Sequence, residues 1–397
     1  MFMRRYNLHV LVEVIKLFVV ALTAMTLISV LVGVVEKLIA EGLGVFAILQ
    51  LLPFVLLISL QFVVPATLLF AVCSVFGRMA ADNEIVAIKS IGISPIRIVI
   101  PVLVFALALS PIAVYLNDLA VSWGRPGINR VVMQSLEEII YRVLRSHHSY
   151  SSHSGFSVHV QDVQDRWLIR PTIVIYGANG GEAQTIMADK AQLSWNAEKE
   201  NLTMKLVNYE SFGSKFSLIV DGSQELELPK NLPATKGENS DSPSQFALKE
   251  IGSQIRWEIH KINLNQDMHT AYESAGLLIG RAGMFDDTIA KHYAWVVTAS
   301  QQRLNRLETE PWRRWAAGFC CFFFVWVGIP LAIWMRSADY WTTFGLCFLP
   351  ILLIYYPLFA LGLDRSKDGS WPPYSVWLGN IVLLAIGSTL LRRVYRS

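Results

Sequence analysis

Residues 77–95, with the sequence GRMAADNEIVAIKSIGISP, form a short charged connection between two long apolar stretches. The flanking stretches cover residues 45–76 and 96–116. A helix needs about 20 mostly apolar residues to cross the hydrocarbon core of a bilayer, so each stretch is long enough to span a membrane. The connection must then reverse the chain at one membrane surface.

The composition of this connection favours a short helix. Asp82 or Asn83 can cap a helix start, and Gly92 suits a helix end because glycine tolerates a left-handed backbone. We therefore expect a helix near 78–92 that either lies on lipid headgroups or docks in a groove of a cytoplasmic ATPase. The side chains that would carry such docking are Arg78, Asp82, Glu84, Ile85, Ala87, Ile88, Lys89 and Gly92.

Six apolar stretches of this kind occur in the chain, three before and three after a region of nearly 200 residues that has none. They cover residues 17–35, 45–76, 96–116, 315–335, 341–363 and 374–391. The sequence therefore predicts a polytopic α-helical membrane protein with six transmembrane helices and a polar domain inserted between the third and the fourth. The expected divisions are 1–116, 117–310 and 311–397.

The composition agrees with this division. Of 397 residues, 53% are hydrophobic and 16% are charged, and mean hydropathy is +0.42. Soluble domains carry about 25% charged residues. A pure bundle of spans could hardly hold 34 basic and 31 acidic residues, so the insert must carry much of the charge. All four cysteines lie in predicted spans, which excludes a disulfide framework in the insert.

Lysine and arginine are enriched in the loops on one side of the predicted spans. If the N-terminus is cytoplasmic, the inner segments hold nine of them and the short outer loops hold three, one of which is Lys37. Positively charged loops tend to stay in the cytoplasm. We therefore expect a protein of a bacterial inner membrane with both termini on the cytoplasmic side and the insert in the periplasm. Arg313 and Arg314 are an exception at the outer end of the fourth span. We expect both to extend to the aqueous interface beside tryptophans.

The insert changes character along its length. Residues 118–145 have apolar positions three and four apart, which is typical of a helix that continues the third span. Residues 155–228 alternate apolar and polar side chains in short runs, with a glycine-rich turn at 177–181, and predict an antiparallel β jelly roll. A linker follows at 229–244, and helix-forming residues return over 245–310.

One face of the predicted sheet is apolar. Val158, Val160 and Leu193 fall on this face and are candidates for a lipid slot. A cluster of histidines near the start of the sheet suits either a metal site or a solvated loop. Its Ser-rich surroundings without cysteine favour the loop, so no metal is expected. The cluster consists of His147, His148, His153 and His159.

The sequence contains no motif for catalysis or nucleotide binding. It lacks GxxxxGK[ST], GxSxG and HExxH, and the span centres carry no Asp, Glu, Lys or Arg. An ion-coupled pump needs such intramembrane charges. We therefore expect neither an enzyme nor a chain with its own cofactor. Energy for any transport must come from outside the bilayer. The alternative is a membrane-anchored sensor or assembly scaffold with a ligand-binding outer domain.

The connection at 77–95 resembles the coupling helix of the LptF/LptG family, the transmembrane permease subunits of the ABC transporter that exports lipopolysaccharide. The family pattern is matched by Arg78, Glu84, Ala87 and Gly92. IMADKAQL at 186–193 and SWPPYSVWLGN at 370–380 are also similar to the family. The resemblance covers most of the chain.

The resemblance implies a transport mechanism. Two permeases pair, as homologous subunits or as two copies, and bind a dimer of a cytoplasmic ATPase similar to LptB. That ATPase holds ATP and Mg²⁺. Its closure moves lipopolysaccharide, or a similar large amphiphile, to periplasmic jelly-roll proteins similar to LptC and LptA; no nucleic acid takes part. Two features depart from the family: Lys37 is the one basic residue placed to meet a lipid headgroup, and the segment 256–302 is longer than usual.

Overall fold

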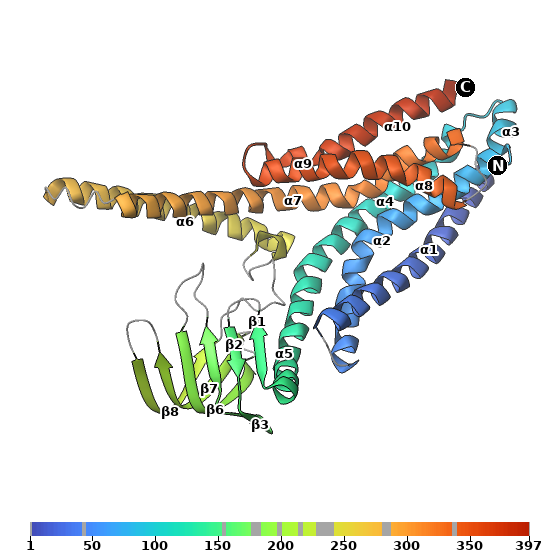
Figure 1. The fold of residues 1–397 in the computed structure, drawn as a ribbon. Helices are drawn as coiled ribbons and strands as arrows, with labels where there is room; N and C mark the ends of the chain where they lie inside the picture. Colours follow the sequence, from blue (N-terminus) through green and yellow to red (C-terminus); the bar gives the residue numbers. More distant parts are fainter. Residues whose placement is uncertain are drawn as a thin grey trace. The chain divides into compact units, whose positions relative to one another are not determined.

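The structure is a computed structural model that divides into two compact units (Figure 1). Unit 1 comprises Met1–Ser29, Leu56–Ser122 and Ser242–Ser397, and unit 2 comprises Val30–Val55 and Trp123–Asp241. The described residues are 2–41, 45–152, 156–175, 184–196, 201–212, 217–227, 242–279, 287–335 and 340–396. The predicted turn at 177–181 and most of the predicted linker at 229–244 lie outside them.

The described residues contain six helices that are long and apolar enough to cross a membrane, which confirms the predicted class of fold. They are α1 (Phe2–Glu41), α2 (Val45–Ala81), α4 (Ile96–Leu119), α7 (Asp287–Met335), the pair α8 (Tyr340–Pro350) and α9 (Tyr356–Lys367), and α10 (Leu378–Arg396). A π-helical turn, Ile351–Tyr355, joins α8 to α9, and a 3₁₀ turn, Pro373–Trp377, precedes α10. The short helix α3 (Glu84–Ser90) connects α2 to α4.

The core of unit 1 is built around α2, α4 and α7. Leu68, Val72 and Phe76 recur every fourth residue on α2 and are fully buried with residues of α7. Gly318 permits a close approach of α7 to α4, because a Cβ there would lie 2.3 Å from Val114 Cγ2 and 2.7 Å from the Val114 backbone nitrogen. α1 is the least buried of the six spans, and α7 is the most buried.

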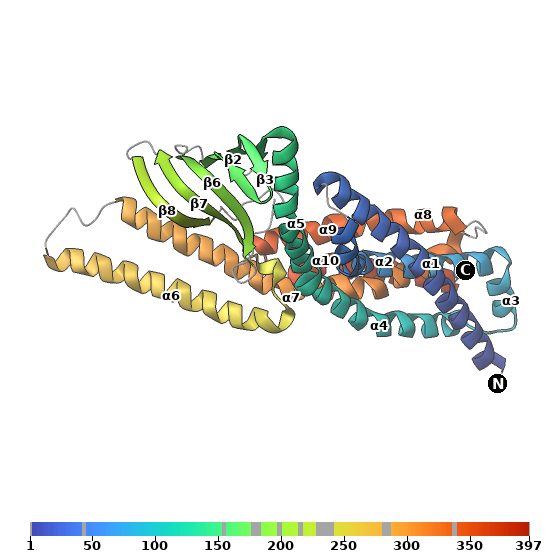
Figure 2. The same cartoon turned by 90° about the horizontal axis from the view of Figure 1, so that it is seen from below.

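Both ends of the chain lie at the end of unit 1 that carries α3, as two perpendicular views agree (Figures 1 and 2). An even number of spans requires this arrangement. α3 therefore lies on the same side of the bundle as the two termini.

The long segment after the sheet is a helical hairpin within unit 1. Helix α6 (Leu248–Ile279) packs along the first part of α7. Glu258 is buried between them, with only 2% of its side chain exposed, and it pairs with Arg303 at 3.4 Å and with Lys261 at 3.8 Å. The segment 256–302 thus falls in this hairpin.

The described residues of unit 2 contain an eight-stranded antiparallel sheet. Its strands are β1 (Ser149–Ser152), β2 (Phe156–His159), β3 (Asp162–Gln164), β4 (Trp167–Ile169), β5 (Thr172–Ile175), β6 (Gln184–Asn196), β7 (Asn201–Phe212) and β8 (Ser217–Glu227). The order is β1-β2-β5-β6-β4-β3, with β7 on the other side of β6 and β8 beyond β7. The insertion of an antiparallel β domain between the third and fourth spans is thereby confirmed.

Helix α5 (Arg125–His147) covers the apolar face of this sheet. It follows α4 after a π-helical turn, Ala120–Gly124. Ile140, Tyr141 and Leu144 are buried against sheet residues such as Val158 and Leu193. The sheet core is therefore filled by a helix and not by a second sheet.

Candidate functional site

Helix α3 is bounded by a left-handed residue at each end. At its start, Asn83 has φ of 56° and makes no side-chain cap, although its carbonyl accepts a hydrogen bond from the Ala87 N–H at 2.9 Å. At its end, Gly92 has φ of 78°, and the Ile93 N–H donates to the Ile88 carbonyl at 3.2 Å. Together with the bond from the Gly92 N–H to the Lys89 carbonyl at 2.9 Å, the Ile93 bond forms a Schellman ending, for which glycine is the favoured residue. The connection thus forms the short helix that the sequence predicts.

The apolar side chains of α3 divide between its two faces. Ile85 is buried in the core of unit 1, and Ile88 packs against the same core. The expected display of Ile85 to a partner is therefore wrong in this arrangement, because that face secures α3 to the bundle. Val86, 45% exposed, and Ile91, 74% exposed, are the apolar side chains that face outward. Residue spacing in the sequence offers Ile91 as an alternative to Ile85, but it does not point to Val86.

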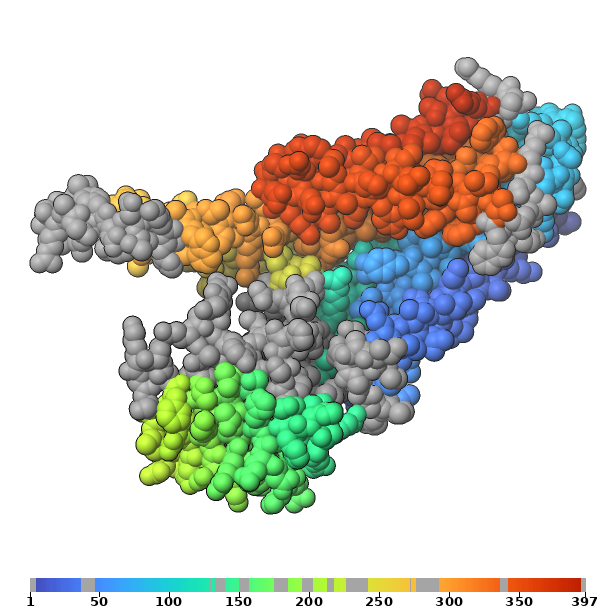
Figure 3. Space-filling view, in the orientation of Figure 1, coloured from blue at the N-terminus to red at the C-terminus, as the bar shows by residue number. Residues whose placement is uncertain are grey.

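Some polar residues of this segment are exposed to solvent, and two residues of the segment bond to side chains of α1. Asp82 and Glu84 are exposed, and Glu84 Oε2 accepts a hydrogen bond from the Tyr6 hydroxyl at 3.0 Å. Arg78, at the end of α2, forms an ion pair with Glu13 of α1. Lys89 is half-buried, while Ala87 and Gly92 are exposed. Light blue marks this region at the surface in Figure 3. Of the residues that match the family pattern, Glu84, Ala87 and Gly92 are thus exposed, whereas Arg78 is partly buried and paired with α1.

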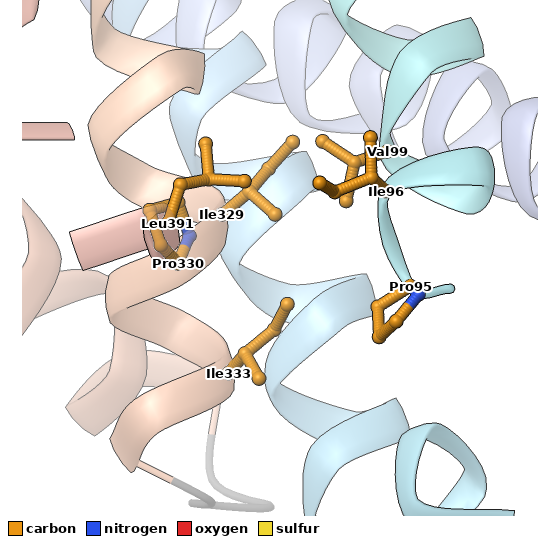
Figure 4. Close-up of a pocket in the computed structure, with 7 residues that line it drawn as sticks. All are labelled: Pro95, Ile96, Val99, Ile329, Pro330, Ile333 and Leu391. Carbon is orange, nitrogen blue, oxygen red and sulfur yellow. The ribbon is translucent and has the colours of Figure 1, made fainter. Parts of the chain in front are cut away.

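A small apolar recess lies beside the segment that follows α3 (Figure 4). Three helices contribute to it: α4, α7 and α10. Its lining is Pro95, Ile96, Val99, Ile329, Pro330, Ile333 and Leu391. Because the lining side chains are all apolar, the recess offers no charged side chain to a phosphate.

A charged cluster at the other end of the spans is buried. Arg314 of α7 is completely buried and forms an ion pair with Asp118 of α4. It also donates to the Phe246 carbonyl at 2.6 Å and to the Ser244 carbonyl at 3.3 Å. Glu310, one turn earlier on α7, lies 3.8 Å from Arg314.

The prediction that Arg314 extends to the aqueous interface is therefore wrong. Its guanidinium has anionic and carbonyl partners inside unit 1, which compensate for its removal from water. Arg313 remains slightly exposed and pairs with Glu310 at 2.7 Å. The charge cluster joins α4, α7 and the chain just before α6.

The candidate lipid-slot residues of the sheet are buried beneath α5. Val158 and Leu193 are each about 1% exposed, and Val160 is also buried. The hydroxyl of Tyr141 fixes α5 there, since it accepts a hydrogen bond from the Leu193 N–H at 2.9 Å. These candidate residues are therefore part of the buried core between α5 and the sheet. No local sequence pattern points to this role of Tyr141.

The remaining candidate residues are Lys37 and the four histidines near the start of the sheet. Lys37 lies in α1, but its side chain is outside the described part of the structure, as is His153. His147, His148 and His159 are exposed. Among the described residues, no group of His, Cys, Asp and Glu side chains is arranged to hold a metal ion.

Comparisons with known proteins place the chain in a family. No curated protein sequence matches it. The family model described as lipopolysaccharide export system permease LptF/LptG matches residues 8–393, which is nearly the whole chain. The match includes all six spans, α3 and the sheet. The chain therefore belongs to the LptF/LptG family of lipopolysaccharide export permeases, and it is a component of a transporter in the inner membrane rather than an enzyme.

Proposed function

We propose that this chain is the permease subunit that a cytoplasmic ABC ATPase drives through α3, so that lipopolysaccharide is extracted from the inner membrane and passed to periplasmic jelly-roll proteins. The observation that carries the proposal is the set of exposed side chains on α3 and beside its two ends, namely Asp82, Glu84, Val86 and Ile91. It lies on the side of the bundle that holds both termini. The lysine and arginine distribution supports a cytoplasmic location for that side.

This set of side chains suits a groove in a soluble ATPase better than a lipid surface. It combines two carboxylates with two apolar side chains, and anionic headgroups repel carboxylates. ATP and Mg²⁺ would bind to the ATPase dimer, because the chain has no P-loop sequence. The role of the chain is then to convert movement of α3 into movement of the spans.

The poorly buried spans support pairing with a second permease, homologous or identical. α1 and the span formed by α8 and α9 are the two least buried of the six. They carry large exposed apolar side chains along their length, among them Leu27 and Leu31 of α1 and Leu349 and Leu353 of the other span. A partner permease and the acyl chains of the lipid are suitable occupants of these surfaces. In this proposal Lys37, which follows the first apolar stretch in the sequence, would be the residue that meets a headgroup phosphate.

A pull-down with a charge reversal tests the proposed function. The tagged full-length chain, solubilised from its own membrane, is expected to retain an ABC ATPase. Glu84→Lys should abolish that retention, whereas Arg393→Glu, a charge change at the exposed end of α10, should preserve it. Absence of any ATPase from the unaltered chain, together with normal lipid export by Glu84→Lys, would contradict the proposal and favour a sensor or scaffold.

A further inference from the structure

Two polar contacts join the first two turns of α1 to the segment that contains α3. The Tyr6 hydroxyl donates to Glu84 Oε2 at 3.0 Å, at the first residue of α3. The Asn7 side-chain amide donates to the Arg97 carbonyl at 3.0 Å, in the first turn of α4. The start of α1 is therefore bonded to the first residue of α3 and to the start of α4.

A third contact follows further along α1. Glu13 forms an ion pair with Arg78, which precedes α3 on α2. Both side chains are about one-third exposed, so solvent weakens their attraction. The pair therefore helps to orient α1 against α2 more than it stabilises the fold. The three contacts lie on the same side of the bundle as the termini, where the family's ATPase would bind.

The rest of α1 is only loosely held within unit 1. Val10, Val14 and Phe18 are buried in the core, at four-residue spacing. Among the described side chains from 19 to 29, Thr26 is the buried one. The part of α1 that is firmly attached to the bundle is thus the part that contacts the connection, and a shift at this end moves the long exposed remainder.

Glu84 has the capacity to bind Tyr6 and a partner at the same time. A carboxylate has two acceptor oxygens and about four lone-pair sites, and Tyr6 takes one of these on Oε2. Glu84 is also exposed, so a cationic side chain of an ATPase can approach it from outside. Docking therefore does not require the Tyr6 hydrogen bond to break.

We propose that Tyr6 is a positioning residue that ties α3 to α1 through Glu84, so that displacement of α3 by the ATPase is passed directly to the first span. This inference rests on the function proposed above. It assigns to the start of α1 a role in transmission, distinct from the role of α3 in docking. Asn7 and Glu13 support the same tie through Arg97 and Arg78.

Removal of one hydroxyl group tests this tie. Tyr6→Phe keeps the ring and its packing but deletes the bond to Glu84, and Tyr115→Phe on the exposed face of α4 is the matched control. Each full-length variant is purified with its ATPase, reconstituted in proteoliposomes, and assayed for ATP hydrolysis with and without lipopolysaccharide. For Tyr6→Phe we expect wild-type retention of the ATPase and wild-type basal hydrolysis, with a roughly fivefold smaller increment from lipopolysaccharide.

A second variant separates transmission from docking. Glu84→Gln keeps an acceptor oxygen for Tyr6 but removes the charge that a cationic partner needs. We expect Glu84→Gln to reduce retention of the ATPase. The stimulation of ATP hydrolysis by lipopolysaccharide, measured per retained ATPase, should stay within about twofold of wild type, which is the opposite pattern to Tyr6→Phe.

Several results would overturn the inference. One is a Tyr6→Phe variant whose ATP hydrolysis is stimulated by lipopolysaccharide as much as that of Tyr115→Phe. Another is loss of the ATPase from Tyr6→Phe, which would make Tyr6 part of the docking surface. Either result leaves the proposed function standing. Capture of no ATPase by the unaltered chain overturns both proposals together.

Discussion

Tyr141 of α5 satisfies a backbone group of Leu193 that has no strand partner on that side of β6. β4 pairs with β6 at Ala191 and Lys190 and does not extend to Leu193. The Leu193 N–H instead donates to the Tyr141 hydroxyl at 2.9 Å, and that hydroxyl donates to the Arg166 carbonyl at 2.7 Å. α5 therefore closes the sheet with side-chain hydrogen bonds as well as apolar contacts.

We expect Tyr141→Phe to loosen α5 without unfolding the sheet. The variant leaves the Leu193 N–H without its acceptor, which costs about 1–3 kcal/mol when the group is buried. Amide hydrogen exchange should accelerate at Leu193 and along α5. Tyr209→Phe is the control in the same unit, because its hydroxyl bonds Gln224 of the neighbouring strand. Equal acceleration in both variants would show that Tyr141 has no special role.

A photo-crosslinker tests whether lipid reaches the covered face. At Leu193, which is buried under α5, adducts with lipopolysaccharide should form in energised membranes and be rare without ATP. Tyr141→Phe should increase the yield at rest. Ile219 of β8 is exposed and serves as a control for adducts that do not depend on α5. If no ATP-dependent adduct forms at Leu193, Val158 or Val160, the proposed lipid slot is ruled out.

Arg314→Met should destabilise unit 1 strongly. The substitution leaves Asp118 without its cationic partner and two carbonyls without a donor, and breaking a buried pair costs about 3–5 kcal/mol. Thermal unfolding of the detergent-solubilised protein measures the effect. Arg313→Met should cost much less, because Arg313 is partly exposed and pairs with Glu310 alone among the contacts described. Similar losses in the two variants would contradict this ranking.

The crossing of α4 and α7 should not accept a side chain at residue 318. Gly318→Ala places a Cβ 2.7 Å from the Val114 backbone nitrogen, so the two helices must separate. We expect a loss of about 1–3 kcal/mol from overpacking, visible as a lower unfolding temperature. Gly345→Ala in α8 has open space around the new Cβ and should be neutral or stabilising, since alanine favours helix. A Gly318→Ala protein as stable as Gly345→Ala would contradict the close crossing.

The spans and the strands could be predicted because their patterns are local. Apolar runs of more than 18 residues and period-two alternation depend on neighbours in the sequence, and the structure has helices and strands at those places. The end of α3 could also be predicted from the sequence, because Gly92 suits the left-handed backbone that closes the helix.

The orientation of side chains between distant elements could not be predicted in the same way. Ile85 and Ile91 are the same residue type in the same short segment, yet Ile85 is buried and Ile91 is exposed. Arg314 looks like an interfacial residue until Asp118, 196 positions away, is seen to pair with it. Tyr6 and Tyr141 lack any local pattern that links them to Glu84 and Leu193. Such pairings depend on which helices meet, and one sequence does not contain that information.

The partners of Arg314 lie next to two of the points at which the chain passes between the units. Asp118 precedes the passage after Ser122, and Ser244 and Phe246 follow the passage after Asp241. Within unit 1, one guanidinium thus binds residues beside the point where the chain leaves for the β domain and beside the point where it returns. A change at Arg314 would therefore release both of these chain segments from α7 at once.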